Sequence, residues 1–165
     1  MQVKEDQLEL TTEVQELCLY LRHPLILVFW ALWILNDHLF KAMFANELTG
    51  KLSDIASLAV FPLFPLACYD IISFYAKRPR KHFDLVLYAS LVATGMVMVG
   101  INISPAWADA YRHGLGLAQW PLLALKDLLN NGELSSLKTV KLTMDPSDSY
   151  TLPALLIPWL VVKKL

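Results

Sequence analysis

Two aspartates in this chain have a residue type and a setting that suit acid–base chemistry. Asp54 and Asp148 each follow a serine directly, and each stands near the start of an apolar segment. Two carboxylates that lie close together share a proton and titrate as a pair, which suits acid–base catalysis or cation binding. Helix capping is the alternative, because Ser and Asp side chains accept hydrogen bonds from the free N–H groups at a helix start. Asp145 and Pro146 favour capping near Asp148, since proline is typical of the first helical position.

A third aspartate, Asp70, interrupts the apolar segment of residues 55–76. Charged side chains at membrane depth are costly, so they usually pair with another charge or mark an ion pathway. We expect either a structural ion pair with the basic stretch at residues 77–82, in which Lys77 is the nearest cation, or a relay for protons or cations.

A polar cluster is predicted at the outer end of the first apolar segment. Asp37 and Lys41 are four residues apart, so they can form an ion pair on one helix face. In the simpler interpretation this pair lies at the interface and His38 points to water. In the alternative, the polar groups line an outward-facing cavity with Asp54 and are functional candidates. The predicted members of the cluster are Asn36, Asp37, His38, Lys41, Thr49 and Lys51.

The composition is typical of a membrane protein. Of the 165 residues, 56% are hydrophobic and 18% are charged, against about 45–50% and about 25% in soluble domains. The formal net charge of −1 gives no basic field, so we expect no nucleic-acid partner. The two cysteines and four scattered histidines have no metal-ligand spacing, and no phosphate-binding or hydrolase motif occurs. We expect no metal and no cofactor.

Four apolar segments predict an all-α membrane protein with four spans, at residues 24–44, 55–76, 85–101 and 149–162. A spanning helix needs about 20 residues. The second and third segments meet this length, and the first meets it only if its polar residues 36–38 enter the boundary zone. The fourth is about one turn too short and would have to thin the bilayer. Pro62 and Pro65 predict a kink in the second span.

The two ends of the chain are predicted to lie in the cytoplasm. Residues 1–22 have apolar residues at spacings of three and four, which predicts an amphipathic helix whose acidic face is available to another protein. Residues 23–165 form the predicted membrane domain. The positive charges of the loop at 77–82 predict that this loop lies in the cytoplasm. An outer insertion at residues 105–140 is predicted to hold a short amphipathic helix from Pro121 to Gly132, followed by an extended stretch at 135–143. The expected location is the inner (plasma) membrane, as a multi-pass protein in contact with the lipid bilayer.

An internal match suggests that the membrane domain contains a repeat. Residues 48–58 read LTGKLSDIASL and residues 142–152 read LTMDPSDSYTL, with five of eleven positions identical. Each copy precedes an outer-side entry into a span. This arrangement predicts two parallel helical hairpins related by a pseudo-two-fold axis along the membrane normal.

The same residues carry a family resemblance. The sequence TGKLSD at 49–54 and the sequence DPSDSYTLP at 145–153 resemble the TGKLSD and D-P-[ST]-D-x-x-x-L-P motifs of a family of small bacterial integral membrane proteins. Asn36-Asp37-His38 also fits the family's pattern. The resemblance covers residues 35–65 and 140–160, and residues 55–57 depart from it, since the family has an aromatic residue and a glycine there. The resemblance implies a bacterial integral membrane protein. It does not indicate an activity, because the family is uncharacterised.

Three classes of function are consistent with these features. We favour a non-enzymatic component that senses, scaffolds or assembles with partners, including copies of itself, because no catalytic fingerprint is present. A small transporter or oligomeric channel is the second interpretation, supported by the repeat, the broken spans and Asp70. The third is a membrane-embedded hydrolase or transferase that uses an Asp54/Asp148 pair.

Overall fold

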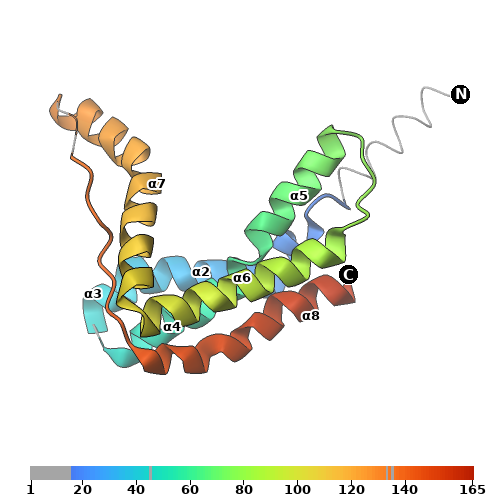
Figure 1. Ribbon diagram of the computed structural model, residues 1–165, viewed down its shortest axis with the longest axis horizontal. Helices are drawn as coiled ribbons and strands as arrows, with labels where there is room; N and C mark the ends of the chain where they lie inside the picture. Colours follow the sequence, from blue (N-terminus) through green and yellow to red (C-terminus); the bar gives the residue numbers. More distant parts are fainter. Residues whose placement is uncertain (1–15, 45, 133, 135) are drawn as a thin grey trace, which may run out of the picture. The chain divides into compact units, whose positions relative to one another are not determined.

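Every regular element that the structure describes is helical (Figure 1). The structure is a computed structural model that describes residues 16–44, 46–132, 134 and 136–165. Most of the amphipathic helix predicted over residues 1–22 lies outside the described residues, and only the short 3₁₀ helix η1 (Leu19–Arg22) is seen there. The chain divides into two compact units, one reaching to Gly95 and including Tyr150–Leu165, the other covering Met96–Ser149.

Among the described residues, three helical stretches are long and apolar enough to cross a membrane, which indicates a multi-pass membrane protein. The first, Pro24–Phe44, consists of α2 (Pro24–Leu35), the π-helical turn η2 (Asn36–Phe40) and α3 (Lys41–Phe44). It begins where the His23 ring accepts a hydrogen bond from the N–H of Leu25, with proline in the first turn. The bounds agree with the predicted first span.

The second span is interrupted where the sequence predicted a kink. It consists of α4 (Glu47–Val60) and α5 (Leu63–Tyr75), separated by a turn at residues 61–62. This interruption confirms the predicted kink. It arises because neither Pro62 nor Pro65 has an N–H group to donate to the preceding helical turn. The third span, α6 (Phe83–Ile103), is one uninterrupted helix, also as predicted.

The predicted fourth span is not a single α-helix. Residues 146–164 form the 3₁₀ helix η3 (Pro146–Leu155) followed by α8 (Leu156–Lys164). Pro153 and Pro158 lie inside this stretch and remove two backbone donors, which disfavours a regular α-helix, whereas Pro146 is the first residue of η3. In the first unit, η1, α2, α5, α6 and α8 share one core, formed by Tyr20, Ile26, Leu63, Leu66, Ala67, Leu87, Val161 and Val162.

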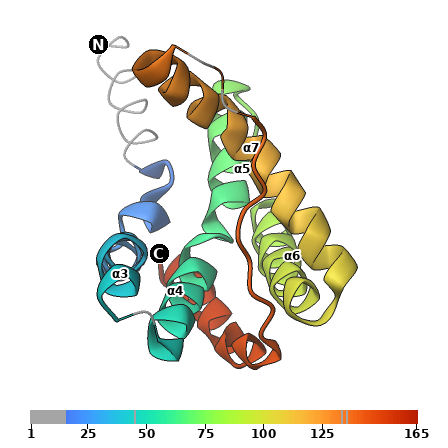
Figure 2. The same cartoon turned by 90° about the vertical axis from the view of Figure 1, so that its left-hand side faces the viewer.

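The second unit contains one long helix and a returning segment. Helix α7 (Pro105–Asn131) starts at the N-cap Ser104 and ends at Gly132, whose positive φ of 72° is typical of a helix C-terminus. The end at Gly132 is confirmed, but the predicted start at Pro121 is wrong, because the helix runs through that proline. Residues 136–145 have no helix and run back along α7, where the Arg112 carbonyl accepts from Val140 N–H (Figure 2).

The two copies of the internal sequence match have different backbone conformations. Residues 48–58 lie entirely inside α4. Of residues 142–152, the first four have no helix and the rest are in η3. Pro146 and the preceding Asp145 start the 3₁₀ helix, and the first copy has Leu52 and Lys51 at these positions. The sequence match therefore does not extend to the local structure.

Candidate functional site

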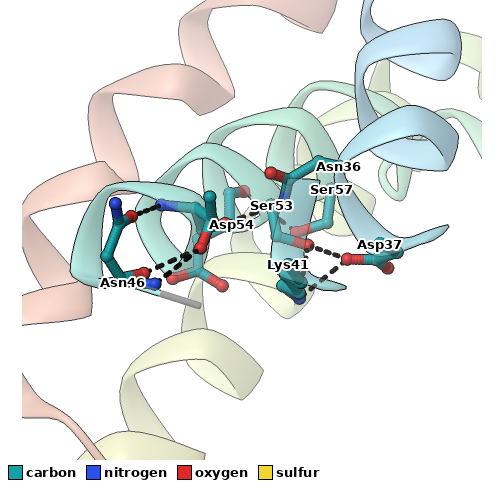
Figure 3. A network of polar contacts seen from close by, with 8 residues as sticks. Asn36, Asp37, Lys41, Asn46, Ser53, Asp54 and Ser57 are labelled. Atoms are coloured by element: carbon teal, nitrogen blue, oxygen red, sulfur yellow. Dashed lines mark hydrogen bonds and ion pairs between the residues drawn. The ribbon is translucent and has the colours of Figure 1, made fainter. Parts of the chain in front are cut away.

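A compact polar contact joins the first span to the second (Figure 3). The Nζ of Lys41 lies 2.7 Å from Oδ1 of Asp37, so the predicted ion pair at i and i+4 is present. The Ser53 hydroxyl donates to the same Asp37 oxygen at 2.8 Å, and Lys41 Nζ donates to Ser53 Oγ at 3.2 Å. These three residues, called the Asp37 clasp below, form a closed triangle in which each side chain contacts the other two.

The π-helical turn positions a second contact between the same two spans. Asn36, the first residue of η2, is fully buried, and its amide Nδ2 donates to the Thr49 carbonyl oxygen at 2.7 Å. Its Oδ1 is buried without a hydrogen-bond partner among the described residues. A π turn adds a residue to the helical turn and is frequent at functional sites. Here it coincides with the two residues, Asn36 and Asp37, that reach toward α4.

The start of α4 is fixed by a capping box that the sequence analysis missed. Asn46 Oδ1 accepts from the Thr49 N–H at 3.0 Å, and Thr49 Oγ1 accepts from the Asn46 N–H at 3.3 Å. The spacing N-x-x-T was visible in the sequence and is related to the S/T-x-x-E box. Because Thr49 and Ser53 are one turn apart, fixing this cap also fixes the position of Ser53.

The predicted polar cluster is thus brought together in part. Asn36, Asp37, Lys41 and Thr49 make the contacts above, while His38 is exposed and has no hydrogen bond or ion pair within the described part of the chain. Lys51 and Asp54 are half-buried on α4, and both take part in interactions. Asp54 lies in the middle of α4, so the prediction that Asp54 caps a helix is wrong, and Asn46 does so instead.

Near the second predicted carboxylate, the cap is provided by Asp145. Its Oδ1 accepts from the Ser147 N–H at 2.9 Å, and its carbonyl accepts from the Asp148 N–H at 3.0 Å. The Asp145 N–H in turn donates to Oδ1 of Asn102 at 3.0 Å. Asp148 lies in the first turn of η3 and belongs to the second unit, whereas Asp54 belongs to the first. A functional pair of these two carboxylates stays a prediction.

A second cluster surrounds Asp70 on α5, called the Asp70 cluster below. The Asp70 side chain is 1% exposed, and Nε of Arg80 lies 3.3 Å from its Oδ1. An ion pair with the basic stretch was one of the two interpretations, but the partner is Arg80 and not the nearer Lys77. Lys77 instead adopts a left-handed conformation, with φ of 51°, directly after Ala76, the C-cap residue of α5.

Tyr20 and Cys18 complete this cluster from η1 and the residue before it. Tyr20 is 4% exposed and its ring packs against Phe83 with centroids 6.2 Å apart. Burial raises the pKa of the Tyr20 hydroxyl, and the nearby Asp70 charge raises it further. Burial also raises the pKa of the Cys18 thiol, whose Sγ lies 3.9 Å from the Ala67 carbonyl oxygen. Cys18 is therefore a neutral thiol at physiological pH and a poor nucleophile.

Comparisons with protein-family models, with curated proteins and with solved structures find no match for the chain. The role of the Asp37 clasp and of the Asp70 cluster is therefore inferred from their geometry. In each, a carboxylate on one helix forms an ion pair with a cation, and a polar side chain from another segment contacts it, namely Ser53 at Asp37 and Arg80 itself at Asp70. Such an arrangement holds helices together and keeps the charges neutral at membrane depth.

Proposed function

We propose that this protein is a non-enzymatic multi-pass membrane component that assembles with a second copy of itself through the exposed face of its first span. One observation carries the proposal. Only 11% of the most apolar window of Pro24–Phe44 is buried inside the chain, against 50% for Glu47–Tyr75. The first span therefore has a large apolar face that residues 16–44, 46–132 and 136–165 leave uncovered.

An aromatic patch packs the first span against the second, on the side of the first span that its own chain partly covers. Its rings contact one another at centroid distances of 5.1 to 5.9 Å. Tryptophan in spans is enriched at the boundaries, where water can accept its N–H. In this chain the two tryptophans inside the first span pack on Phe64 and Phe61 of the second, so the side chains left exposed for a neighbour are aliphatic, and they include Leu27, Val28 and Ile34. The patch consists of Trp30, Trp33, Phe61 and Phe64.

The use of the polar groups supports a structural role. Asp37 is bound by Lys41 and Ser53, and Asp70 is bound by Arg80. These contacts link segments of one chain and stabilise the shape that a partner would recognise.

The core between the two clusters argues against a conduit. A transporter or channel would need polar groups along the way from Asp37 to Asp70. The buried side chains of α4 and α5 between Ser53 and Asp70 are instead apolar, namely Ala56, Leu58, Ala59, Val60, Leu63, Leu66 and Ala67 with Pro62. Assembly is therefore the better supported function of the three.

A fourth span is part of this proposal. Of the apolar residues 149–162, seven lie in η3 and rise about 2.0 Å each, and seven lie in α8 and rise about 1.5 Å each. Their sum of about 24 Å exceeds the roughly 21 Å of an α-helix of the same length, so the 3₁₀ conformation compensates in part for the short sequence, and local thinning of the bilayer supplies the rest. With four spans and a basic loop inside, both termini face the cytoplasm, and the family resemblance suggests a bacterial inner membrane.

Disulfide cross-linking in native membranes tests the proposed assembly. In a chain with Cys18 and Cys68 replaced by serine, single cysteines are introduced as Val28→Cys in the first span and Val92→Cys in the third. These valines are a matched pair, because each is 59% exposed. After oxidation with copper phenanthroline we expect a covalent dimer from Val28→Cys and little from Val92→Cys. Equal yields at both positions, or none at residue 28, would contradict the proposal.

A further inference from the structure

The loop that joins the second and third spans is short and has a fixed start. Residues 76–82 lie between Tyr75, the last residue of α5, and Phe83, the first residue of α6. The Arg78 N–H donates to the Ser73 carbonyl at 2.9 Å, and Lys77 has a left-handed conformation. Both features are typical of the Schellman motif that ends a helix. Since both flanking helices are candidate spans, the loop must lie at the membrane surface.

Two ion pairs fix the neighbourhood of this loop. Arg80 binds Asp70, as described above, and Lys163 Nζ lies 2.8 Å from Oδ1 of Asp84 near the start of α6. Lys163 Nζ is also 5.6 Å from the centre of the Tyr88 ring. These contacts bring the basic end of α8 next to the loop, although the two are about 80 positions apart in sequence.

The remaining cations of this surface are not neutralised by any residue that the structure describes. They are exposed, and no ion pair involves them within the residues that the structure describes. The two carboxylates nearest to them along α5 and α6, Asp70 and Asp84, are already bound to Arg80 and Lys163. This basic patch consists of Lys77, Arg78, Lys81 and Lys164.

We infer that the basic patch binds the phosphate-containing headgroup of an anionic phospholipid. The inference rests on the proposed membrane function, because it requires the loop to lie at the bilayer surface. Guanidinium and ammonium groups bind phosphate oxygens through charge-assisted hydrogen bonds. Clusters of four or more Lys and Arg residues next to a span are typical of anionic-lipid sites. The pairing of Arg80 and Lys163 within the chain leaves the four patch cations for the lipid.

Thermal unfolding of the full chain in dodecyl maltoside measures this binding. We expect phosphatidylglycerol to raise the melting temperature in a saturable way and phosphatidylcholine to leave it unchanged, because only a bound ligand stabilises the folded state. Replacing both Lys77 and Arg78 by glutamine should weaken the apparent affinity for phosphatidylglycerol at least tenfold, since each surface cation contributes roughly a fivefold factor. The melting temperature without lipid shows whether this variant is folded.

The control removes the same charge elsewhere. Lys126 and Lys138 are exposed lysines of the second unit, and replacing both by glutamine should leave the affinity unchanged. Equal weakening in both double variants, or equal stabilisation by phosphatidylcholine, overturns the inference. Equal stabilisation by inorganic phosphate alone also overturns it, since the site would then bind a free anion. A chain that does not fractionate with membranes at all would refute the proposed membrane function instead.

Discussion

The Nε atom of Arg80 lies 3.3 Å from Oδ1 of Asp70, and the two side chains differ greatly in exposure, at 36% and 1%. The carboxylate is therefore buried, while the guanidinium is partly in contact with solvent. Removing one partner of a buried pair is costly when the charge left behind cannot reach water. The two single substitutions should then have unequal effects.

We expect Arg80→Gln to lower the free energy of unfolding by about 3–5 kcal/mol, because it leaves the Asp70 carboxylate buried and unpaired. Asp70→Asn should cost less, since Arg80 can turn toward water. The double variant should recover much of the loss of Arg80→Gln. Denaturation in detergent of the two single variants and the double variant measures this coupling, with Arg78→Gln as the control. If Arg80→Gln costs no more than Arg78→Gln, the pair does not stabilise the fold.

Ser53 should contribute more to stability than a serine one turn later on the same helix. Its hydroxyl links Asp37 and Lys41 across two spans, whereas the Ser57 hydroxyl only donates to the Asp54 carbonyl of its own helix. We expect Ser53→Ala to lower the free energy of unfolding by about 1 kcal/mol and Ser57→Ala to lower it by less. Thermal unfolding in detergent distinguishes them, and a larger effect at Ser57 would show that the clasp is not stabilising.

The extent of the spans could be predicted from sequence because hydropathy is a local property. The first and third spans match their predicted bounds within two residues, and the interruption of the second follows from Pro62. The second span begins eight residues earlier than predicted, at Glu47, because the capping box at Asn46 makes the more polar residues 47–54 helical as well. The contacts of the candidate site could be predicted only in part. Asp37 and Ser53 are 16 positions apart, and their contact depends on how the chain reverses between α3 and α4.

The partner of Asp70 shows the same limit. Lys77 is the nearest cation in sequence, but the left-handed turn at that residue redirects the chain so that Arg80 returns to Asp70.

The start of α7 was also mispredicted because of contacts that are distant in sequence. Proline interrupts a short isolated helix, but a long helix held by other contacts can include it. Arg112 and Gly116 of α7 make such contacts with the returning segment.

Two glycines of α7 provide a matched test of those contacts. A Cβ at Gly116 would collide with the Lys138 carbonyl, whereas a Cβ at Gly114 would have nothing within 4 Å. We expect Gly116→Ala to displace the returning segment and speed up tryptic cleavage after Lys138 and Lys141. Gly114→Ala should leave cleavage unchanged and stabilise the helix by roughly 0.5–1 kcal/mol. Equal cleavage rates in both variants would mean that the segment does not pack on Gly116.

Burial of Tyr20 predicts a loss of stability at alkaline pH. The pKa of this hydroxyl is raised above its ordinary value of 10.0, so it stays protonated in the folded state while the unfolded state ionises. The unfolded state then binds fewer protons, and the free energy of unfolding falls as the pH rises above about 10. Tyr20→Phe should reduce this fall, and Tyr75→Phe, at an exposed position, should not. Unfolding in detergent at pH 8 to 11 checks the slope, and identical slopes in both variants would contradict the assignment.

The side of the membrane on which the loop lies can be tested with single cysteines in intact cells. Starting from the chain without Cys18 and Cys68, a cysteine replaces Pro79 in the basic loop or Asn130 near the end of α7, both of which are exposed. Because basic loops are retained in the cytoplasm, we expect an impermeant maleimide to label residue 130 in intact cells. Residue 79 should be labelled only after the cells are broken. Labelling of residue 79 in intact cells would reverse the proposed topology. It would also place the basic patch on the outer leaflet, where a lipid site would have to be tested with outer-leaflet lipids.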